Sequence, residues 1–283
     1  MKQEQKDSTI HTLSADEVTD NTKGYALVTG ASSGMGREYA RELYALGHNL
    51  IIVARKSEDI DNVRDELLSS DGSKTDVISI ALDLALPQSS DILYEQVADK
   101  RIDILINNAG VFEYGDVVRT DIDDLSRMLI LHNYTLTRLC RHFVLPMKER
   151  GYGYILNISS LTCWMPYPGL AMYSATKRFN KSFSRSLRVE LKGSGVSVTT
   201  AYFGAVSTNL FPLSDKLRNI AINTGIMITA KKAAHRALKA MFHKRANVMP
   251  GAINYVAIPF LVILPNWFLN FLDKKVLARF KFC

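Results

Sequence analysis

The chain has 283 residues, of which 47% are hydrophobic and 22% charged, so it can bury the core of one large α/β domain or two smaller ones. The net charge of +7 comes without a dense Lys/Arg block or an aromatic-interleaved basic motif, which argues against nucleic-acid binding. The three cysteines have no metal-like spacing, so a reduced, cytoplasmic chain is expected. Residues 1–23 are polar and lack the apolar core of a signal peptide, and a flexible N-terminal extension is predicted there.

The first predicted strand, 24–29, runs directly into a glycine-rich turn, and a helix is predicted over 37–46. A strand, a glycine turn and a helix in this order favour a phosphate-binding βα turn, because glycines allow close backbone approach and the helix N-terminus presents free N–H groups. The spacing Gly-x-x-x-Gly-x-Gly differs from the commoner Gly-x-Gly-x-x-Gly, and a plain glycine loop is the alternative. The candidate phosphate-binding residues are Gly30, Ser32, Ser33, Gly34, Met35 and Gly36.

A second apolar strand, 49–54, ends in Arg55-Lys56. In a dinucleotide-binding fold the end of this strand meets the adenosine ribose. An acidic residue there suits the 2′-hydroxyl of NAD, and a basic one suits the 2′-phosphate of NADP. Arg55 therefore predicts NADP(H) as cofactor, with an ordinary surface arginine as the alternative.

The alternation of strands and helices continues over more than 200 residues without a linker or an internal repeat. Such a pattern predicts one Rossmann-type, doubly wound parallel sheet of about seven strands with helices on both faces, over residues 24–250. Further strands are predicted at 76–82, 101–106, 152–158, 195–203 and 246–249, and further helices at 60–68, 88–98, 121–145, 171–191 and 229–243. No clean period is found over 209–229.

Residues 251–283 form a predicted C-terminal extension, of which 252–272 is strongly apolar. Its length approaches that of a membrane span, but Pro259, Pro265 and three asparagines interrupt it, and basic residues follow. We expect a lid, a pocket wall or a subunit interface. A membrane-surface contact and a true span are the alternatives.

Tyr173 and Lys177 lie four residues apart in a predicted helix, so both side chains leave the same face. A nearby ammonium favours the phenolate, so the pKa of Tyr173 is expected to fall, which suits proton exchange in alcohol–carbonyl redox chemistry. An exposed pair on an amphipathic helix is the alternative for an isolated match.

Taken in order, these motifs resemble those of the classical short-chain dehydrogenases/reductases. The resemblance covers about Gly24 to Met249. It rests on the glycine turn after Thr29, on Asn107-Asn108-Ala109-Gly110, and on Asn133, Ser160, Tyr173-Ser174-Ala175-Thr176-Lys177 and Thr208.

This resemblance implies roles for particular residues. Tyr173 is expected as general acid/base, Lys177 as the residue that lowers its pKa, Ser160 (rather than Ser159) as the group that orients the substrate oxygen, and Asn133 as the holder of a relay water. Cofactor contacts are expected from the glycine turn and from Arg55, Asp83, Asn108, Ala109, Gly110, Tyr173, Lys177 and Thr208.

The chain has Phe203-Gly204 where the family usually has Pro-Gly, which alters the wall near the nicotinamide. Candidate substrate contacts are Ser160, Trp164, Tyr167, Tyr173 and Phe203, in an apolar lining that also includes Leu161, Met165, Phe211 and Leu213.

We therefore expect an NADP(H)-dependent oxidoreductase that interconverts a ketone and a secondary alcohol on a hydrophobic substrate, with a hydroxysteroid preferred. A homodimer or homotetramer is expected, in the cytoplasm, with peripheral membrane contact left open. Reduction of a 3-oxoacyl thioester or another lipid-like carbonyl is the second enzymatic reading, and a non-catalytic NADP-binding regulator or membrane-associated scaffold is the alternative from another class.

Overall fold

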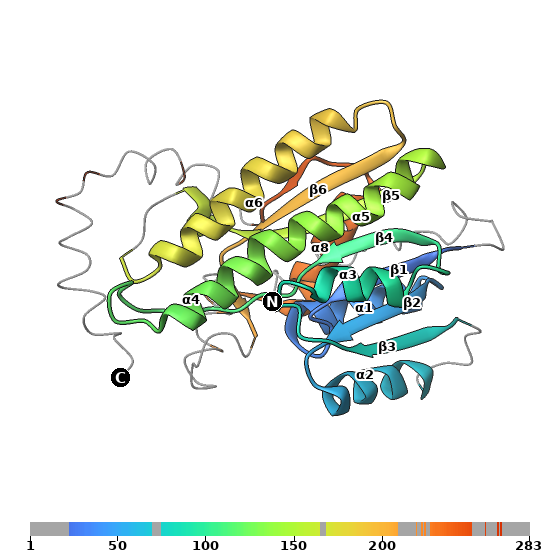
Figure 1. The fold of residues 1–283 in the computed structure, drawn as a ribbon, viewed down its shortest axis with the longest axis horizontal. Coiled ribbons are helices and arrows are strands. Elements are labelled where there is room, and N and C mark those ends of the chain that lie inside the picture. The colour runs from blue at the N-terminus through green and yellow to red at the C-terminus, as the bar shows by residue number, and fades with distance from the viewer. Residues whose placement is uncertain are drawn as a thin grey trace, which may run out of the picture.

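The computed structural model describes residues 23–69, 75–164, 168–208 and 227–250, together with six isolated positions between 219 and 267. Seven parallel strands form the central sheet in the order β3-β2-β1-β4-β5-β6-β9, with helices on both faces (Figure 1). The order reverses between β1 and β4, which is the topological switch point where α/β sheets bind ligands. The predicted doubly wound sheet of about seven strands is confirmed.

The strands are short and mostly buried, which is typical of a parallel sheet covered on both sides. The register pairs Tyr25 with Asn49 in β1 and β2, and Ser160 with Phe203 at the carboxyl ends of β5 and β6. The sheet consists of β1 (Tyr25–Thr29), β2 (Asn49–Ala54), β3 (Val77–Ala81), β4 (Ile102–Asn107), β5 (Gly153–Ser160), β6 (Val196–Phe203) and β9 (Asn247–Val248).

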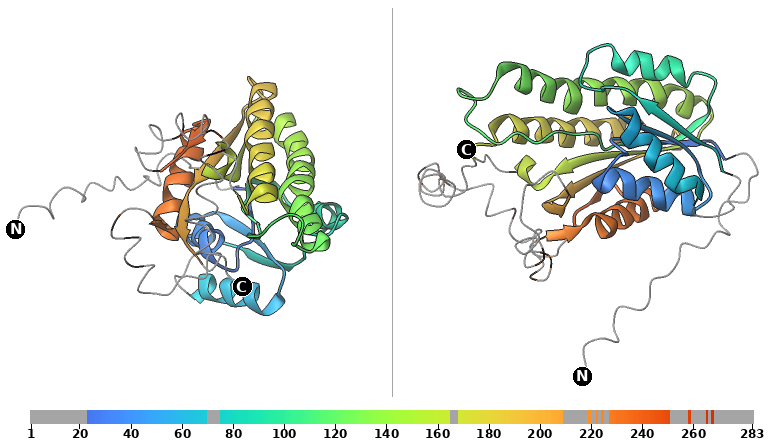
Figure 2. Two further views of the ribbon diagram at one scale, coloured as in Figure 1. Left: turned by 90° about the vertical axis from the view of Figure 1, so that its left-hand side faces the viewer. Right: turned by 90° about the horizontal axis from the view of Figure 1, so that it is seen from below.

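The helices divide between the two faces of the sheet, as the edge-on view in Figure 2 shows. Alternate residues of β1 supply both cores: Ala26 and Val28 pack with the helices of one face, and Leu27 packs with those of the other. One face carries α1 (Gly34–Ala45), α2 (Ser57–Ser69) and α8 (Ala230–Phe242), and the other carries α3 (Ser89–Gln96), α5 (Leu136–Glu149) and α6 (Ala171–Glu190).

The single helix predicted over 121–145 is not continuous. It comprises α4 (Ile122–Leu129), a π-helical turn, η2 (Ile130–Thr135), and α5. A π-helical turn inside an α-helix is rare and frequently marks a functional site. Here it carries His132 and Asn133.

Two short strands outside the main sheet were not predicted. β7 (Ala205–Ser207) pairs in parallel with β8 (Met227–Thr229). In this pair Ala205 lies beside Met227 and Ser207 beside Thr229. A 3-10 turn, η3 (Leu161–Trp164), follows β5.

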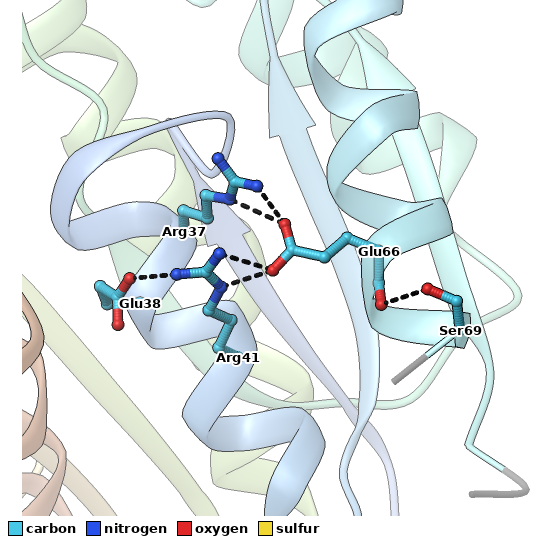
Figure 3. Close-up of polar contacts among 5 residues, drawn as sticks. All are labelled: Arg37, Glu38, Arg41, Glu66 and Ser69. Atoms are coloured by element: carbon cyan, nitrogen blue, oxygen red, sulfur yellow. Dashed lines mark hydrogen bonds and ion pairs between the residues drawn. The ribbon is translucent and has the colours of Figure 1, made fainter. Parts of the chain in front are cut away.

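Helices α1 and α2 are joined by an ionic cluster centred on Glu66 (Figure 3). One carboxylate oxygen of Glu66 accepts hydrogen bonds from Arg37, and the other pairs with Arg41, whose Nη1 also lies 2.6 Å from Glu38. The cluster therefore ties the last part of α2 to the middle of α1.

The predicted N-terminal extension and nearly all of the apolar segment 252–272 lie outside the described residues. The domain boundaries at 23 and 250 stay predictions. None of the helices in the described part of the chain has the length and apolar character needed to cross a bilayer.

Candidate active site

A cleft of about 500 Å³ opens at the carboxyl ends of the strands, around the switch point between β1 and β4. Most of the residues predicted for cofactor and catalysis line this one cleft, although they come from eight separate loops or element ends. The predicted residues in its wall are Gly30, Ser32, Ser33, Gly34, Met35, Arg55, Asp83, Asn108, Ala109, Gly110, Ser160, Tyr173, Lys177, Phe203 and Thr208.

The glycine turn forms a cradle that has no room for a side chain at Gly30 or Gly36. A Cβ at Gly36 would lie 2.0 Å from the Gly30 carbonyl oxygen, and one at Gly30 would lie 2.8 Å from the Ala109 Cα. Gly30 and Gly34 also have positive φ angles of 66° and 54°. The backbone therefore lies directly at the cleft beside the start of α1, which fits a pyrophosphate-bearing ligand.

Thr29 and Asn108 hold this turn against the end of β4. The Thr29 hydroxyl accepts the backbone N–H groups of Asn108 and Ala109, each at 3.0 Å. The Asn108 amide donates to the Thr29 and Gly30 carbonyls at 2.9 and 3.2 Å. Asn108 thus braces the phosphate turn with its amide N–H groups, in addition to lining the cleft as predicted.

Ser160, Tyr173 and Lys177 lie together at the inner end of the cleft. Ser160 and Tyr173 share a side-chain hydrogen bond, and the Lys177 Nζ lies 5.5 Å from the Tyr173 ring centroid. The neighbouring Ser159 hydroxyl instead donates to the Lys177 carbonyl at 2.9 Å. Ser159 therefore anchors α6, and Ser160 is the serine that interacts with the tyrosine. The expected part of Ser160 in orienting the substrate oxygen stays a prediction.

The predicted fall in the pKa of Tyr173 is not found. Burial raises this pKa to about 12, against the opposing effect of the Ser160 hydrogen bond. Burial also lowers the pKa of Lys177 to about 8. The tyrosine is only 9% exposed and the lysine 6%, so the loss of hydration is the main cause of both pKa shifts.

Asn133 does not line the cleft. Its side chain instead forms hydrogen bonds to α6. Its amide donates to the Thr176 carbonyl at 3.0 Å and to Asn180 Oδ1 at 3.3 Å. The Asn133 carbonyl accepts the N–H of Leu136 at the end of the π-helical turn. Its predicted part in a proton relay stays a prediction.

The predicted substrate contacts divide into three groups. Phe203 is buried and lines the cleft, paired in the ladder beside Ser160, and Leu161 lines it too. Trp164 is not part of the cleft wall: its ring packs on Tyr202 at 4.4 Å, and the Lys181 Nζ lies 4.4 Å from it. Met165, Tyr167, Phe211 and Leu213 fall outside the described residues.

Two residues were missed as parts of the site. Phe112 meets the Tyr173 ring edge-to-face at 5.1 Å, and Arg127 reaches the cleft from α4 to pair with Asp83 at 2.7 Å. Phe112 follows the Asn-Asn-Ala-Gly stretch closely, which is a weak sequence signal. Arg127 gave none, since it lies 44 positions from its partner.

The parallel sheet and the glycine cradle define a Rossmann-type nucleotide-binding protein, and the Ser160–Tyr173–Lys177 cluster is its candidate catalytic site. Residues 24–218 match the family model for short chain dehydrogenases. The chain belongs to the short-chain dehydrogenase family.

Several relatives and solved structures are similar to this chain. The very-long-chain 3-oxoacyl-CoA reductase of Bos taurus is 35% identical over 190 residues, which are 66% of this chain and 60% of the relative. The inactive hydroxysteroid dehydrogenase-like protein 1 of Homo sapiens is 32% identical over 77% of this chain and 65% of its own length. A short-chain dehydrogenase from Sphingobium yanoikuyae in complex with NADPH superposes with a TM-score of 0.73 at 29% identity, covering 84% of this chain and 92% of that one. The chain thus spans less than two thirds of the length of these two curated relatives.

Proposed function

We propose that this protein is an NADP(H)-dependent oxidoreductase that interconverts a ketone and a secondary alcohol on a hydrophobic substrate. The observation that carries the proposal is the contact between Ser160 and Tyr173 within the cleft that also contains the glycine cradle. A binding module needs the cradle but has no need of a buried tyrosine beside a buried lysine.

The residues present fit the cofactor. The backbone of the glycine turn and the N-terminus of α1 would hold the pyrophosphate, Arg55 would meet the 2′-phosphate, and Lys177 would meet the nicotinamide ribose. When bound, NADPH would supply the hydride for reduction of the substrate's carbonyl carbon. The NADPH complex of the Sphingobium yanoikuyae relative supports this choice of cofactor.

The side chains of this protein would then supply the proton that the carbonyl oxygen gains and stabilise the charge that remains. Tyr173 donates its phenolic proton to the carbonyl oxygen as the alcohol forms, and Ser160 donates a hydrogen bond to the same oxygen. Lys177 stabilises the tyrosinate once its ammonium and the phenol oxygen approach each other. With the pKa of Tyr173 at about 12, the neutral phenol is the resting form, which suits a proton donor in the reductive direction.

For the substrate, a long-chain 3-oxoacyl thioester has the best support, because relatives such as the bovine protein are named for that activity. Phe112, Leu161 and Phe203 give the cleft an apolar end next to Tyr173. A hydroxysteroid is the second candidate. The likeness to a protein named as hydroxysteroid dehydrogenase-like favours it, although that relative is named inactive.

We also propose a homodimer or homotetramer. Large apolar side chains are exposed on the helices that cover one face of the sheet: Leu129, Tyr134, Leu145, Phe179 and Val189. Their burial against a second copy would remove them from water. Light scattering during size-exclusion chromatography tests this, and a monomer at micromolar concentration would contradict it.

The function is tested with purified protein, NADPH, and ketones from three classes: 3-oxoacyl thioesters, steroids and short aliphatic ketones. Turnover is expected with one of the first two classes, and Tyr173→Phe should lose at least about a hundredfold in kcat while still binding NADPH. Wild-type-like turnover by Tyr173→Phe would refute the mechanism. NADPH binding without turnover on any ketone would favour a regulator.

A further inference from the structure

Arg127, on α4, reaches across the cleft to the end of β3. Its Nη2 pairs with Asp83 Oδ2 at 2.7 Å, and both residues line the cleft. The second carboxylate oxygen, Oδ1, accepts the Ala85 N–H at 3.0 Å. The side chains of Arg127 and Asp83 are only 37% and 29% exposed, so the pair is partly shielded from water.

Asp83 is charged at neutral pH. Partial burial by itself would raise its pKa, but the hydrogen bonds from Arg127 and the Ala85 N–H, with the charges of Arg127 and Arg55, outweigh burial and lower it. A negative charge therefore lies in the part of the cleft where the adenosine end of a dinucleotide would bind.

Arg55 follows β2, the neighbour of β3, and its charge acts on Asp83. These two groups alone would cancel and leave no net charge for a phosphate. Arg127, however, already holds the Asp83 carboxylate in an ion pair at 2.7 Å, so this carboxylate opposes the charge of Arg55 less strongly. A 2′-phosphate carries nearly two negative charges, so its binding depends on how far Asp83 offsets the charge of Arg55.

We propose that Arg127 is a specificity-determining residue, which neutralises Asp83 and so leaves Arg55 available to the 2′-phosphate of NADP(H). The inference rests on the proposed cofactor. It assigns the preference for NADP(H) over NAD(H) to a pair of arginines on either side of one carboxylate, rather than to Arg55 alone.

The test is a fluorescence titration with NADPH and with NADH, which measures the ratio of the two dissociation constants without any substrate. Arg127→Gln should weaken NADPH about tenfold and NADH less than about twofold. Arg127→Lys, which keeps the charge, should retain most of the preference. Arg119→Gln is the matched control, because Arg119 precedes α4 and its side chain is 83% exposed.

Asp83→Asn distinguishes neutralisation from direct contact with the phosphate. If Arg127 acts by neutralising Asp83, adding Arg127→Gln to Asp83→Asn should change the NADPH/NADH ratio less than about twofold. An equal penalty in both backgrounds, or an unchanged ratio in the Arg127→Gln single variant, would overturn the inference. Wild-type protein that binds neither nucleotide would instead refute the proposed function, and the inference with it.

Discussion

The Nδ1 of His132 lies 3.0 Å from the hydroxyl oxygen of Thr176, the residue before Lys177. Thr176 in turn donates its hydroxyl proton to the Tyr173 carbonyl at 2.8 Å, and His132 Nε2 accepts the Val111 N–H at 3.0 Å. The imidazole is therefore a neutral bridge, protonated at Nδ1, between the loop after β4 and the second turn of α6. Burial, with a smaller contribution from the Lys177 charge, lowers the pKa of His132 well below its usual value and keeps it neutral.

His132→Phe should slow proton transfer by misplacing Tyr173. The Val111 N–H would lose its acceptor, at a cost of about 1–3 kcal/mol in unfolding free energy. We expect kcat to fall about tenfold with little change in the KM for NADPH, because the bridge holds α6 rather than the phosphate turn. Thr176→Val breaks the same bridge from the other side, and the two changes together should cost less than the sum of their effects. Strictly additive effects would contradict a shared bridge, and His142→Phe on α5 is the control.

Lys177 makes stability depend on pH in the alkaline range. Its pKa is about 8 in the folded protein against 10.5 for an unperturbed lysine, so the unfolded chain binds more protons between these two values. The free energy of unfolding contributed by Lys177 should therefore rise with pH over this window, by about 2 kcal/mol between pH ~7.5 and ~9.5. Urea unfolding of the wild type and of Lys177→Met at both pH values measures it. Lys192→Met, at an exposed lysine, is the control, and an identical pH response of wild type and Lys177→Met would refute the prediction.

Gly36→Ala should destroy the phosphate cradle. Its Cβ would lie 2.0 Å from the Gly30 carbonyl oxygen, which is too close for any contact, so the turn must move. We expect NADPH affinity to fall at least about tenfold, measured by fluorescence titration. Gly151→Ala is the control that separates the effect of a steric clash from the effect of backbone strain. Gly151 has a φ of 72°, but an added Cβ would meet nothing within 4 Å. That variant should lose about 1 kcal/mol in stability and keep its affinity for NADPH.

Glu66→Gln should loosen α1 from α2. The side chains of Arg37, Arg41 and Glu66 are 31–43% exposed, so the network is partly screened and is worth about 1 kcal/mol rather than the sum of its pairs. The loss should be largest at low salt and shrink near 1 M NaCl, as followed by urea unfolding. Asp65→Asn, one residue away and 64% exposed, should change stability by less than about 0.5 kcal/mol. A loss that does not depend on salt would argue against an ionic origin.

Local sequence was sufficient for the strands of the main sheet, for most of the helices and for much of the cleft. Apolar runs bounded by glycines and charged residues predicted the strands, and the glycine turn after β1 predicted the phosphate cradle. Tyr173 and Lys177 were found together because i, i+4 spacing on a helix is a local property. Ser160 was chosen over Ser159 on the family resemblance rather than on a local pattern, and the structure places Ser160 beside the phenol.

The electrostatics of the site could not be predicted in this way. Spacing suggested that Lys177 lowers the pKa of Tyr173, but the pKa depends on how much water each group loses when the whole domain folds, and burial raises it instead. Trp164 was expected in the pocket by its position after Ser160. In the structure, the Trp164 ring packs instead on Tyr202 of β6.

The sequence by itself determined the doubly wound sheet and the glycine cradle, because short-range periodicity and turn chemistry encode them, whereas the candidate serine, tyrosine and lysine were selected by the family resemblance. Only the tertiary structure decided which distant side chains meet: Arg127 with Asp83, His132 with Thr176, Glu66 with Arg37. These pairs lie between 29 and 44 residues apart. Their meeting depends on how the helices pack on the sheet, and no local pattern records that packing.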